Sequence, residues 1–285
     1  MKFLDIFLSI MLEATPFLLL GVVVSSLIQY YVSDDWIENH LPKKIISGTL
    51  TGIFLGLFIP LCDCAIVPIV RRLIKKRIPL NICISFLLSS PILNPVSILS
   101  TITAFHKTMP VMIFYRIIFA VIISFITGIM INFLIPNNGV LKQHNTEKYW
   151  DCHHCEINKK DGILKGMASE FWAIFRYLCL GAILTSITQS LVDFEHINLQ
   201  YPKILQIIIM MFFAFIISLC STEDAFIAKT FLGKMTDNSI LAFLLLGPML
   251  DMKNMIVLKG SFTTKFIITL FACVCFLVIC CSLIL

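Results

Sequence analysis

Charged residues are scarce in this chain of 285 residues. Asp, Glu, Lys and Arg make up 14% of the sequence, 58% of the residues are hydrophobic, and the mean hydropathy is +0.93. A water-soluble domain of this size needs far more polar surface, so the composition excludes one and indicates an integral membrane protein. The apolar runs are continuous rather than alternating, which excludes a transmembrane β-barrel.

Several other signals are missing. There is no glycine-rich nucleotide-binding loop, so any energy-driven activity would draw on the proton gradient or on a separate partner. Residues 3–31 have no small-x-small cleavage site and contain Asp5 and Glu13, which predicts a retained first helix instead of a signal peptide. The basic residues flank apolar segments and form no aromatic-interleaved patch, so we expect no nucleic-acid partner. Most of the 11 cysteines lie within apolar segments, unlike a secreted disulfide framework.

Eight hydrophobic segments are each near or above the roughly 20 residues that a helix needs to cross a bilayer. They lie at about 3–31, 45–70, 78–105, 110–135, 168–190, 204–222, 238–258 and 266–285. We therefore expect an all-α membrane protein of about eight transmembrane helices in two four-helix halves, residues 1–135 and 166–285. Residues 136–165 form the one long polar stretch and are expected to be a linker loop.

The two halves resemble each other in sequence. Four pairs of residues recur in the same order at a spacing of 157 to 160 residues: Gly21 and Gly181, Cys62 and Cys220, Pro91 and Pro248, and Asn94 and Asp251. This pattern predicts an internal repeat. Transporters commonly bind their substrate at such a repeat interface, where helices are broken.

Lysine and arginine set the expected orientation. With the N-terminus inside, 13 of these residues fall in inner segments and 7 in outer loops. The positive-inside rule then places both termini and the linker loop in the cytoplasm. Four crossings per half imply parallel repeats, whereas re-entrant motif segments would give inverted ones. The sequence leaves both arrangements open.

The first polar motif, Cys62-Asp63-Cys64, lies between Pro60 and Pro68 in a hydrophobic segment. Proline removes a backbone donor and clashes with the preceding turn, so we expect broken helices at the motif segments. The two thiols can converge on one ion only if the backbone departs from a helix there. Ionisable groups at membrane depth are costly and are functional candidates by default.

The second motif contains Cys220, Glu223 and Asp224. Thiolates and carboxylates together suit soft or borderline cations such as zinc, cadmium or copper(I), and trivalent arsenic also favours thiols. The two acids would supply counter-charge or exchange protons; alternatively, they cap a short helix that begins near Asp224. Asn94 and Asp251 follow the repeated prolines, and each would offer an oxygen ligand.

Three further ionisable residues, Glu13, Arg116 and Arg176, lie within or at the edges of hydrophobic segments. An internal Glu–Arg pair is one interpretation, and proton coupling through Glu13 is a second hypothesis. Glycines at every fourth position from Gly48 to Gly56 predict close packing of one segment against a neighbour.

The linker loop carries Cys152, His153, His154 and Cys155. Two cysteines at this spacing can share a tetrahedral zinc, with one histidine and an outside ligand such as His144 completing the site. Metal sensing or delivery is one hypothesis for this loop. Thiol–disulfide exchange and incidental loop residues are the alternatives.

At these motifs the chain resembles the ArsP-like family of predicted permeases. The resemblance covers both halves and is carried by Pro60-Leu61-Cys62-Asp63-Cys64-Ala65-Ile66-Val67-Pro68, Arg71-Arg72-Leu73, Pro91-Ile92-Leu93-Asn94-Pro95, Cys220-Ser221-Thr222-Glu223-Asp224-Ala225-Phe226 and Gly247-Pro248-Met249-Leu250-Asp251. It implies an eight-helix permease of the inner membrane. Better-understood members export trivalent organoarsenicals, and relatives are associated with zinc or copper efflux.

We therefore expect a transporter and not an enzyme, with no required cofactor. The aspartate between the two cysteines and the Cys-His-His-Cys loop favour export of a soft or borderline metal over export of a neutral organoarsenical. The main alternative is efflux of trivalent arsenicals by three thiols, those of Cys62, Cys64 and Cys220. A membrane thiol oxidoreductase and a non-transporting subunit of a larger complex are the others. Expected partners are the lipid bilayer, the transported metal or metalloid, and an accessory membrane or metal-delivery protein.

Overall fold

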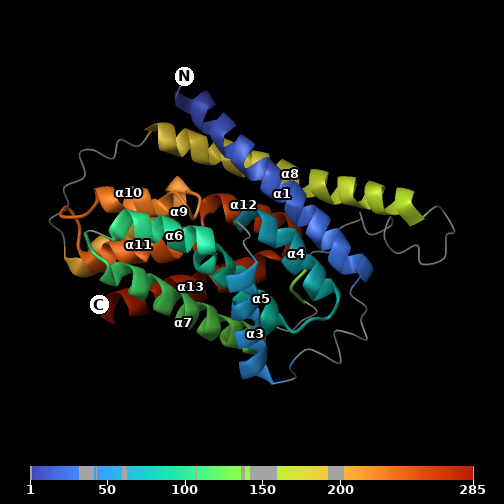
Figure 1. The fold of residues 1–285 in the computed structure, drawn as a ribbon, viewed down its shortest axis with the longest axis horizontal. Helices are drawn as coiled ribbons and strands as arrows, with labels where there is room; N and C mark the ends of the chain where they lie inside the picture. The colour runs from blue at the N-terminus through green and yellow to red at the C-terminus, as the bar shows by residue number, and fades with distance from the viewer. Residues whose placement is uncertain are drawn as a thin grey trace.

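The computed structural model describes residues 2–31, 42, 44–59, 63–106, 108–135, 139–141, 159–191 and 202–284. Over these residues the fold is all-α, as expected. The described residues contain two isolated β-bridges and no β-strand. The helices are α1 (Lys2–Tyr31), α3 (Ile45–Phe58), α4 (Asp63–Lys75), α5 (Leu80–Leu93), α6 (Pro95–Phe105), α7 (Val111–Leu134), α8 (Lys159–Leu191), α9 (Lys203–Ile217), α10 (Asp224–Thr230), α11 (Asp237–Met249), α12 (Met252–Ser261) and α13 (Thr264–Ile284). Figure 1 shows α1 and α8 side by side along one edge of the molecule.

Among the described residues, six helical spans, rather than the expected eight, are long and apolar enough to cross a membrane. They are Leu4–Leu27, Leu80–Phe105, Val111–Leu134, Met167–Ile187, Asp237–Ser261 and Thr264–Ile284. The two remaining segments contain α3 and α9, which have 14 and 15 residues. At a rise of about 1.5 Å per residue, each is too short for a hydrocarbon core of about 30 Å.

Both cysteine motifs interrupt a helix, as expected from the prolines and the polar residues. In the first half α3 ends at Phe58 and α4 begins at Asp63. In the second half α9 ends at Ile217, and Ser218 takes a left-handed conformation with φ of 49° that stops the helix.

Asn94 and Asp251 mark two further helix breaks. The side chain of Asn94 accepts a 2.9 Å hydrogen bond from the Val96 N–H at the start of α6. Asp251 Oδ1 accepts one from the Asn254 N–H, at 2.5 Å, in the first turn of α12. Both side chains are therefore N-caps, which satisfy helix donors that would otherwise lack a partner in the membrane.

The neighbouring helices α3 and α5 run in the same direction. Gly48 of α3 faces Asn81 and Ile82 at the start of α5, whereas Gly56 faces Ser89 and Ser90 near its end. The Asn81 side chain also donates a 2.9 Å hydrogen bond to the Ile45 carbonyl. The chain therefore runs in one direction along α3, turns back along α4, and runs along α5 in the same direction as α3.

The second half has the same arrangement in α9 and α11. The Gln206 side chain near the start of α9 accepts a 3.1 Å hydrogen bond from the Thr236 N–H, just before α11. Further along, Gly247 of α11 faces Ala214 of α9. The segment that contains α10 therefore returns the chain to the end at which α9 began.

Loop contacts show which helix ends lie together. Leu141, which follows α7, forms a β-bridge with Phe262, and the Thr263 N–H donates to the Val140 carbonyl at 2.9 Å. The Asn238 side chain at the start of α11 donates to the Ser282 carbonyl at the end of α13, at 2.7 Å. The end of α7 thus lies beside the end of α12, and the start of α11 lies beside the end of α13.

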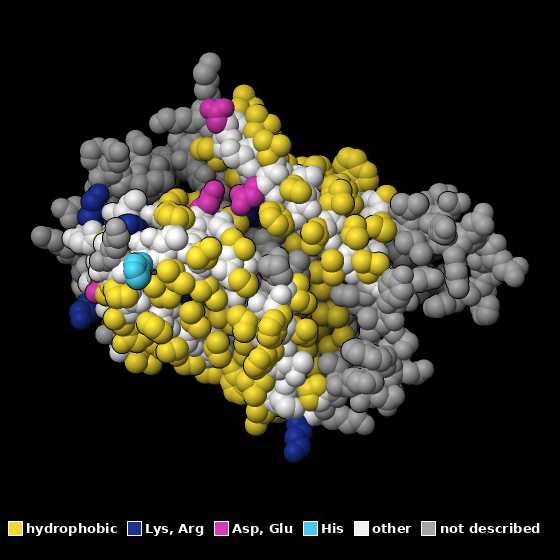
Figure 2. Space-filling view, viewed as in Figure 1, with side chains coloured by type: hydrophobic (Ala, Val, Ile, Leu, Met, Phe, Trp, Pro, Cys, Tyr) yellow, Lys and Arg dark blue, Asp and Glu magenta, His cyan; other side chains and the backbone are white. Residues whose placement is uncertain are grey.

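The interrupted helices α5 and α11 form the centre of the molecule. Every residue of α5 is buried, as is α11 from Ser239 to Met249. The outer helices expose many large apolar side chains, which cover much of the face in Figure 2. Such an apolar exterior is expected where the surrounding solvent is lipid.

Close packing of α3 on α5 depends on Gly52. An added Cβ there would overlap the Ile82 carbonyl oxygen and the Ser85 hydroxyl. We predict that Gly52→Ala destabilises the protein by about 1–3 kcal/mol through overpacking and lowers its melting temperature in detergent. Gly247→Ala is the matched control, because a Cβ there meets only Ala214, at 3.8 Å. Equal melting temperatures for the two variants would contradict the close approach.

Candidate functional site

Residues 218–223, called the Cys220 segment below, form the better-described half of the candidate site. This segment has left the helix, so its backbone carbonyls need partners from elsewhere. Ser97 of α6 donates to the Ser221 carbonyl at 2.9 Å, and Ser100 of α6 donates to the Thr222 carbonyl. The first half of the chain therefore satisfies the open backbone of the second half.

A buried ion pair lies directly beside this segment. Arg116 of α7 donates to Asp224, the first residue of α10, at 2.6 Å, and each side chain is 2% exposed. The same guanidinium donates to the Thr101 hydroxyl at 2.7 Å and to the Ser97 hydroxyl at 3.4 Å. These contacts join α6, α7 and α10 across the boundary between the two halves.

This ion pair corrects two expectations from the sequence. The acidic partner of Arg116 is Asp224 and not Glu13, while Arg176 is exposed and donates to the Trp172 carbonyl of its own helix. The helix α10 does begin at Asp224, as the capping interpretation expected, but Glu223 makes no side-chain cap bond. The Asp224 carboxylate binds Arg116 instead.

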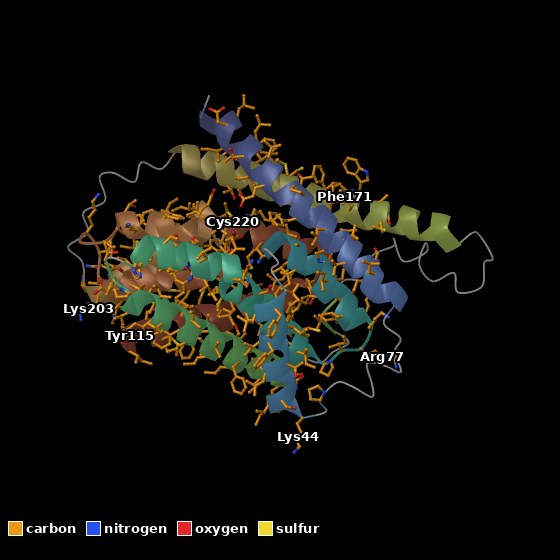
Figure 3. The ribbon with its side chains drawn as sticks, in the orientation of Figure 1. Lys44, Arg77, Tyr115, Phe171, Lys203 and Cys220 are labelled. Carbon is orange, nitrogen blue, oxygen red and sulfur yellow. The ribbon has the colours of Figure 1, made fainter. Side chains whose placement is uncertain are left out.

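The thiol and the glutamate of the segment are accessible, whereas Ser218 and Ser221 are buried. Cys220 is half-buried and Glu223 is exposed; Figure 3 shows Cys220 near the middle of the molecule. The charges of Glu13 in α1 and Lys253 in α12 both act on Glu223, so these two helices approach the segment. Lys253 is itself buried, and its backbone N–H donates to the Ser218 hydroxyl at 3.2 Å. Figure 2 shows acidic side chains gathered among apolar ones on this face.

The first cysteine motif is only partly described. Cys62 lies outside the described residues, and for Asp63 and Cys64 the structure gives the backbone at the start of α4 but not the side chains. Helix α12 contacts both α4, which begins at Asp63, and α9, which ends just before the Cys220 segment. Convergence of Cys62, Asp63 and Cys64 with Cys220 stays a prediction.

Two glycines matched by the repeat are both positions of close approach. An added Cβ at Gly21 of α1 would lie 2.5 Å from the Ala65 carbonyl oxygen in α4. One at Gly181 of α8 would lie 3.2 Å from the Cα of Lys253 in α12. The long first helix of each half therefore packs directly on a short helix that borders the candidate site.

Within the described part of the chain, no group of three or more His, Cys, Asp or Glu side chains is arranged to hold a metal ion. Cys152, His153, His154 and Cys155 of the linker loop lie outside the described residues, so the zinc hypothesis for that loop stays a prediction. Asn94 and Asp251 are buried N-caps, and their role as substrate ligands likewise stays a prediction.

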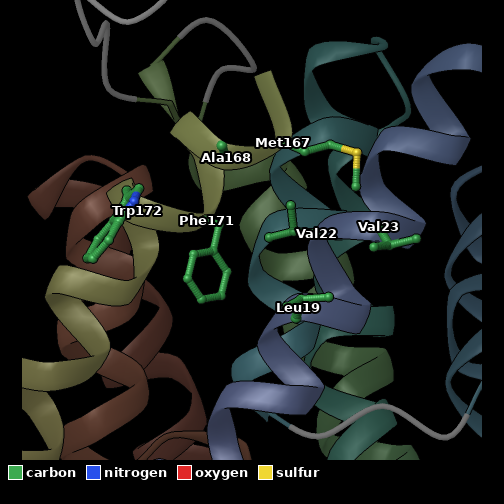
Figure 4. A pocket seen from close by; sticks show the side chains of 7 residues that line it. All are labelled: Leu19, Val22, Val23, Met167, Ala168, Phe171 and Trp172. Atoms are coloured by element: carbon green, nitrogen blue, oxygen red, sulfur yellow. The ribbon is translucent and has the colours of Figure 1, made fainter. Parts of the chain in front are cut away.

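A cavity of about 290 Å³ lies between α1 and α8 (Figure 4). Its lining consists of Leu19, Val22, Val23, Met167, Ala168, Phe171 and Trp172. These side chains offer a cation no oxygen, imidazole or thiolate ligand, so the cavity is separate from the candidate ion site.

Sequence reasoning missed the hydroxyl groups of α6 and the lysine of α12. A usable signal was present, because Ser97, Ser100 and Thr101 are polar positions three and four residues apart in an apolar segment. This spacing puts them on one face of a helix. Lys253 gave a weaker signal because its position near a segment end also suits a loop lysine.

Helices that can span a membrane, with polar groups gathered at breaks in the middle of the molecule, define a membrane permease. Residues 1–285 match the family model ArsP_1, described as "Predicted permease", and the chain belongs to this family. It is a multi-pass membrane protein and a transporter, not an enzyme.

Two relatives are similar over most of their length. The chain is 34% identical over 267 residues to the UPF0718 protein YcgR of Bacillus subtilis (strain 168), which covers 93% of this chain and 90% of YcgR. It is 36% identical over 269 residues to a protein of Streptococcus mutans serotype c (strain ATCC 700610 / UA159), covering 93% and 88%. The name of that second protein proposes it as a subunit of a two-component membrane permease complex. No solved structure matches the chain.

Proposed function

We propose that this permease exports a soft or borderline metal ion of the zinc, cadmium or copper class. The substrate site would lie between the two cysteine-bearing helix breaks, with Cys62, Asp63, Cys64 and Cys220 as its main ligands. One observation carries the proposal: each cysteine motif falls at a boundary between helices, and α12 contacts a helix that adjoins each boundary. Irregular backbone at membrane depth is tolerated only where it is buried in protein or lines a polar cavity.

The chemistry of the ligands supports a soft cation. Two thiols flank Asp63 in the first motif, and the Cys220 segment adds a half-buried thiol with the exposed carboxylate of Glu223. Thiolate ligands favour zinc, cadmium and copper(I) over calcium or magnesium. Glu223 would supply counter-charge as the ion enters or leaves, and Glu13 lies near enough to share that role.

We further propose that α3–α4 and α9–α10 are re-entrant hairpins that enter the membrane from opposite sides. The hairpin α3–α4 opens beside the start of α5, and α9–α10 opens beside the start of α11. One crossing by α5–α6 and one by α7 bring the chain back to the side on which α5 begins. That side is also where α12 ends, because residues 139–141 pair with the chain after α12. Figure 3 shows Lys203 and Tyr115 toward one end of the molecule, Lys44 and Arg77 toward the other, and Cys220 between them.

Three crossings per half make the two halves an inverted repeat, the second arrangement that the sequence left open. The linker loop then lies on the opposite side of the membrane from both termini. Five Lys or Arg residues lie on the side of the termini: Lys2, Lys107, Lys203, Lys229 and Lys234. Fourteen lie on the other side: Lys43, Lys44, Arg71, Arg72, Lys75, Lys76, Arg77, Lys142, Lys148, Lys159, Lys160, Lys165, Lys259 and Lys265. The positive-inside rule therefore favours a cytoplasmic linker loop and extracytoplasmic termini, which replaces the cytoplasmic termini expected from eight crossings.

This orientation predicts opposite signals from two reporter positions. Green fluorescent protein fused after Leu285 stays dark, because it does not mature after export, whereas the same domain inserted near residue 150 fluoresces. Alkaline phosphatase at the same two positions gives the reverse pattern, which controls for expression. Fluorescence at both positions would contradict the inverted arrangement and restore the eight-crossing topology.

A second candidate substrate is a trivalent arsenical bound by three thiols. The buried ion pair favours it in one respect, because Arg116 already neutralises Asp224. The Cys220 segment is then left with one thiol and the Glu223 carboxylate, on which the Lys253 charge acts, so a site with little net negative charge is compatible with the structure. The two substrates are separated by the role of Asp63, as described in the Discussion.

We also propose that a second membrane subunit assists transport, since one relative's name places it in a two-component permease complex. The test of the proposed function is uptake of zinc or cadmium into inside-out membrane vesicles from cells that express the chain. Vesicles from cells that express the chain alone are compared with vesicles from cells that also express a candidate second membrane subunit. Uptake of neither ion, in either preparation, would contradict metal export.

A further inference from the structure

We propose that Arg116 is a positioning residue that fixes the Cys220 segment of the second half onto α6 and α7 of the first. The inference rests on the proposed function, because it concerns the thiol and the carboxylate that this segment would present to the ion. It assigns the arginine a role in shaping the site without direct contact with the substrate.

The geometry around Arg116 supports this role. One terminal nitrogen of the guanidinium donates to Thr101, and the other donates to Asp224 and Ser97. Ser97 in turn donates to the Ser221 carbonyl, the residue after Cys220. The arginine is therefore linked to the chain just after Cys220 at two points, through Ser97 to the Ser221 carbonyl and directly to the Asp224 carboxylate.

Only arginine suits this position. Its guanidinium is planar, permanently charged and able to direct several hydrogen bonds at fixed angles, whereas lysine is a point charge on a flexible chain. A lysine at position 116 could pair with Asp224 but could not hold Thr101 and Ser97 in the same geometry.

Burial indicates that the pair stays closed while the permease works. Both side chains are 2% exposed, and separating them would leave two unpaired charges at membrane depth. The Cys220 segment and α10 would thus move together with α6 and α7. The unit that moves during transport would not coincide with the sequence halves.

The test separates positioning from simple stabilisation by replacing the pair with apolar side chains. Arg116→Met/Asp224→Leu removes both charges of the pair together and leaves neither partner buried alone, and such replacements are often neutral or favourable for folding. The readout is the rate at which N-ethylmaleimide alkylates Cys220 in native membranes, measured on the Cys220 peptide by mass spectrometry. Arg176→Met is the control, because Arg176 is exposed and lies outside the site.

We expect the double variant to insert and to keep a melting temperature close to that of the parent. Its Cys220 would nevertheless react about tenfold faster, because the segment opens locally without its anchor. Arg116→Lys, which keeps the charge and secures folding, should show a smaller rise of about threefold. Cys220 reactivity equal to the parent in Arg116→Lys, or in an inserted double variant, would overturn the proposal.

Alkylation needs no transported ion, so the two proposals fail separately. Raised Cys220 reactivity without any metal uptake would leave the positioning role standing and contradict metal export. Unchanged Cys220 reactivity in the variants, together with metal uptake by the parent, would contradict the positioning role and leave metal export standing.

Discussion

Replacing Cys62 and Cys64 together by serine abolishes metal export in the proposed mechanism, while the protein still inserts into the membrane. Serine keeps the size of the side chain and removes the soft sulfur ligand, so the effect falls on binding and not on packing. Loss of even an outer-shell partner commonly costs a metal site about 10- to 100-fold in affinity, and two direct ligands are removed here. Export should therefore fall to the level of cells without the protein.

The control for this variant lies in α13. Cys275 and Cys280 are half-buried in that helix, remote in sequence from either motif, and are interpreted as small apolar residues. Cys275→Ser/Cys280→Ser should leave export unchanged. Both variants are measured as the zinc or cadmium concentration that halves the growth of an efflux-deficient strain, with membrane protein levels compared on blots. Full resistance in the Cys62→Ser/Cys64→Ser strain would rule out these ligands.

Asp63→Asn should cause a severe loss of zinc or cadmium export and separates the two candidate substrates. Asparagine has the same shape as aspartate but cannot carry the negative charge that offsets a divalent cation at membrane depth. A neutral trivalent arsenical bound by three thiols needs no such charge, so its export would survive the change. The effect on the metal should resemble the loss seen when both cysteines are replaced.

The measurement for Asp63→Asn is resistance to cadmium and to methylarsenite, in parallel, at matched expression. Asp237→Asn is the control, since Asp237 is exposed in the first turn of α11. Cadmium resistance that is retained in Asp63→Asn would transfer the proposal to the arsenical.

The sequence predicted the helical class and the places where helices break. Pro60 before the first cysteines and the polar run from Cys220 to Asp224 indicated the two breaks, whereas Pro68, which was also expected to interrupt its helix, lies within α4. The inferences about the two breaks succeeded because backbone constraints and the cost of polar groups in lipid are local properties.

The number of crossings could not be predicted from hydropathy. Segments 45–70 and 204–222 have the length and apolar character of spanning helices, yet α3 and α9 have only 14 and 15 residues. Only the structure shows that α3 runs parallel to α5, and α9 parallel to α11, so that the chain turns back between the two helices of each pair. Hydropathy reports burial from water and is the same for a spanning helix and for two short helices packed against a buried core.

The acidic partner of Arg116 also could not be identified from the sequence alone. Glu13 and Asp224 were both reasonable acidic partners, and their distances from Arg116 depend on how α1 and α10 pack. Asp224 is 108 positions away along the chain, and the contact depends on α10 lying against α6. Long-range pairing of this kind follows from tertiary structure and leaves no periodic pattern.

The most direct test of the central claim is cell-associated metal measured by elemental mass spectrometry. Cells expressing the protein are compared with cells expressing Cys62→Ser/Cys64→Ser, after separate loading with zinc, cadmium, copper, arsenite and methylarsenite. We predict selective depletion of zinc, cadmium or copper by the native chain, and no depletion by the variant. Depletion of methylarsenite alone, or equal metal contents in the two strains for every load, would contradict metal export.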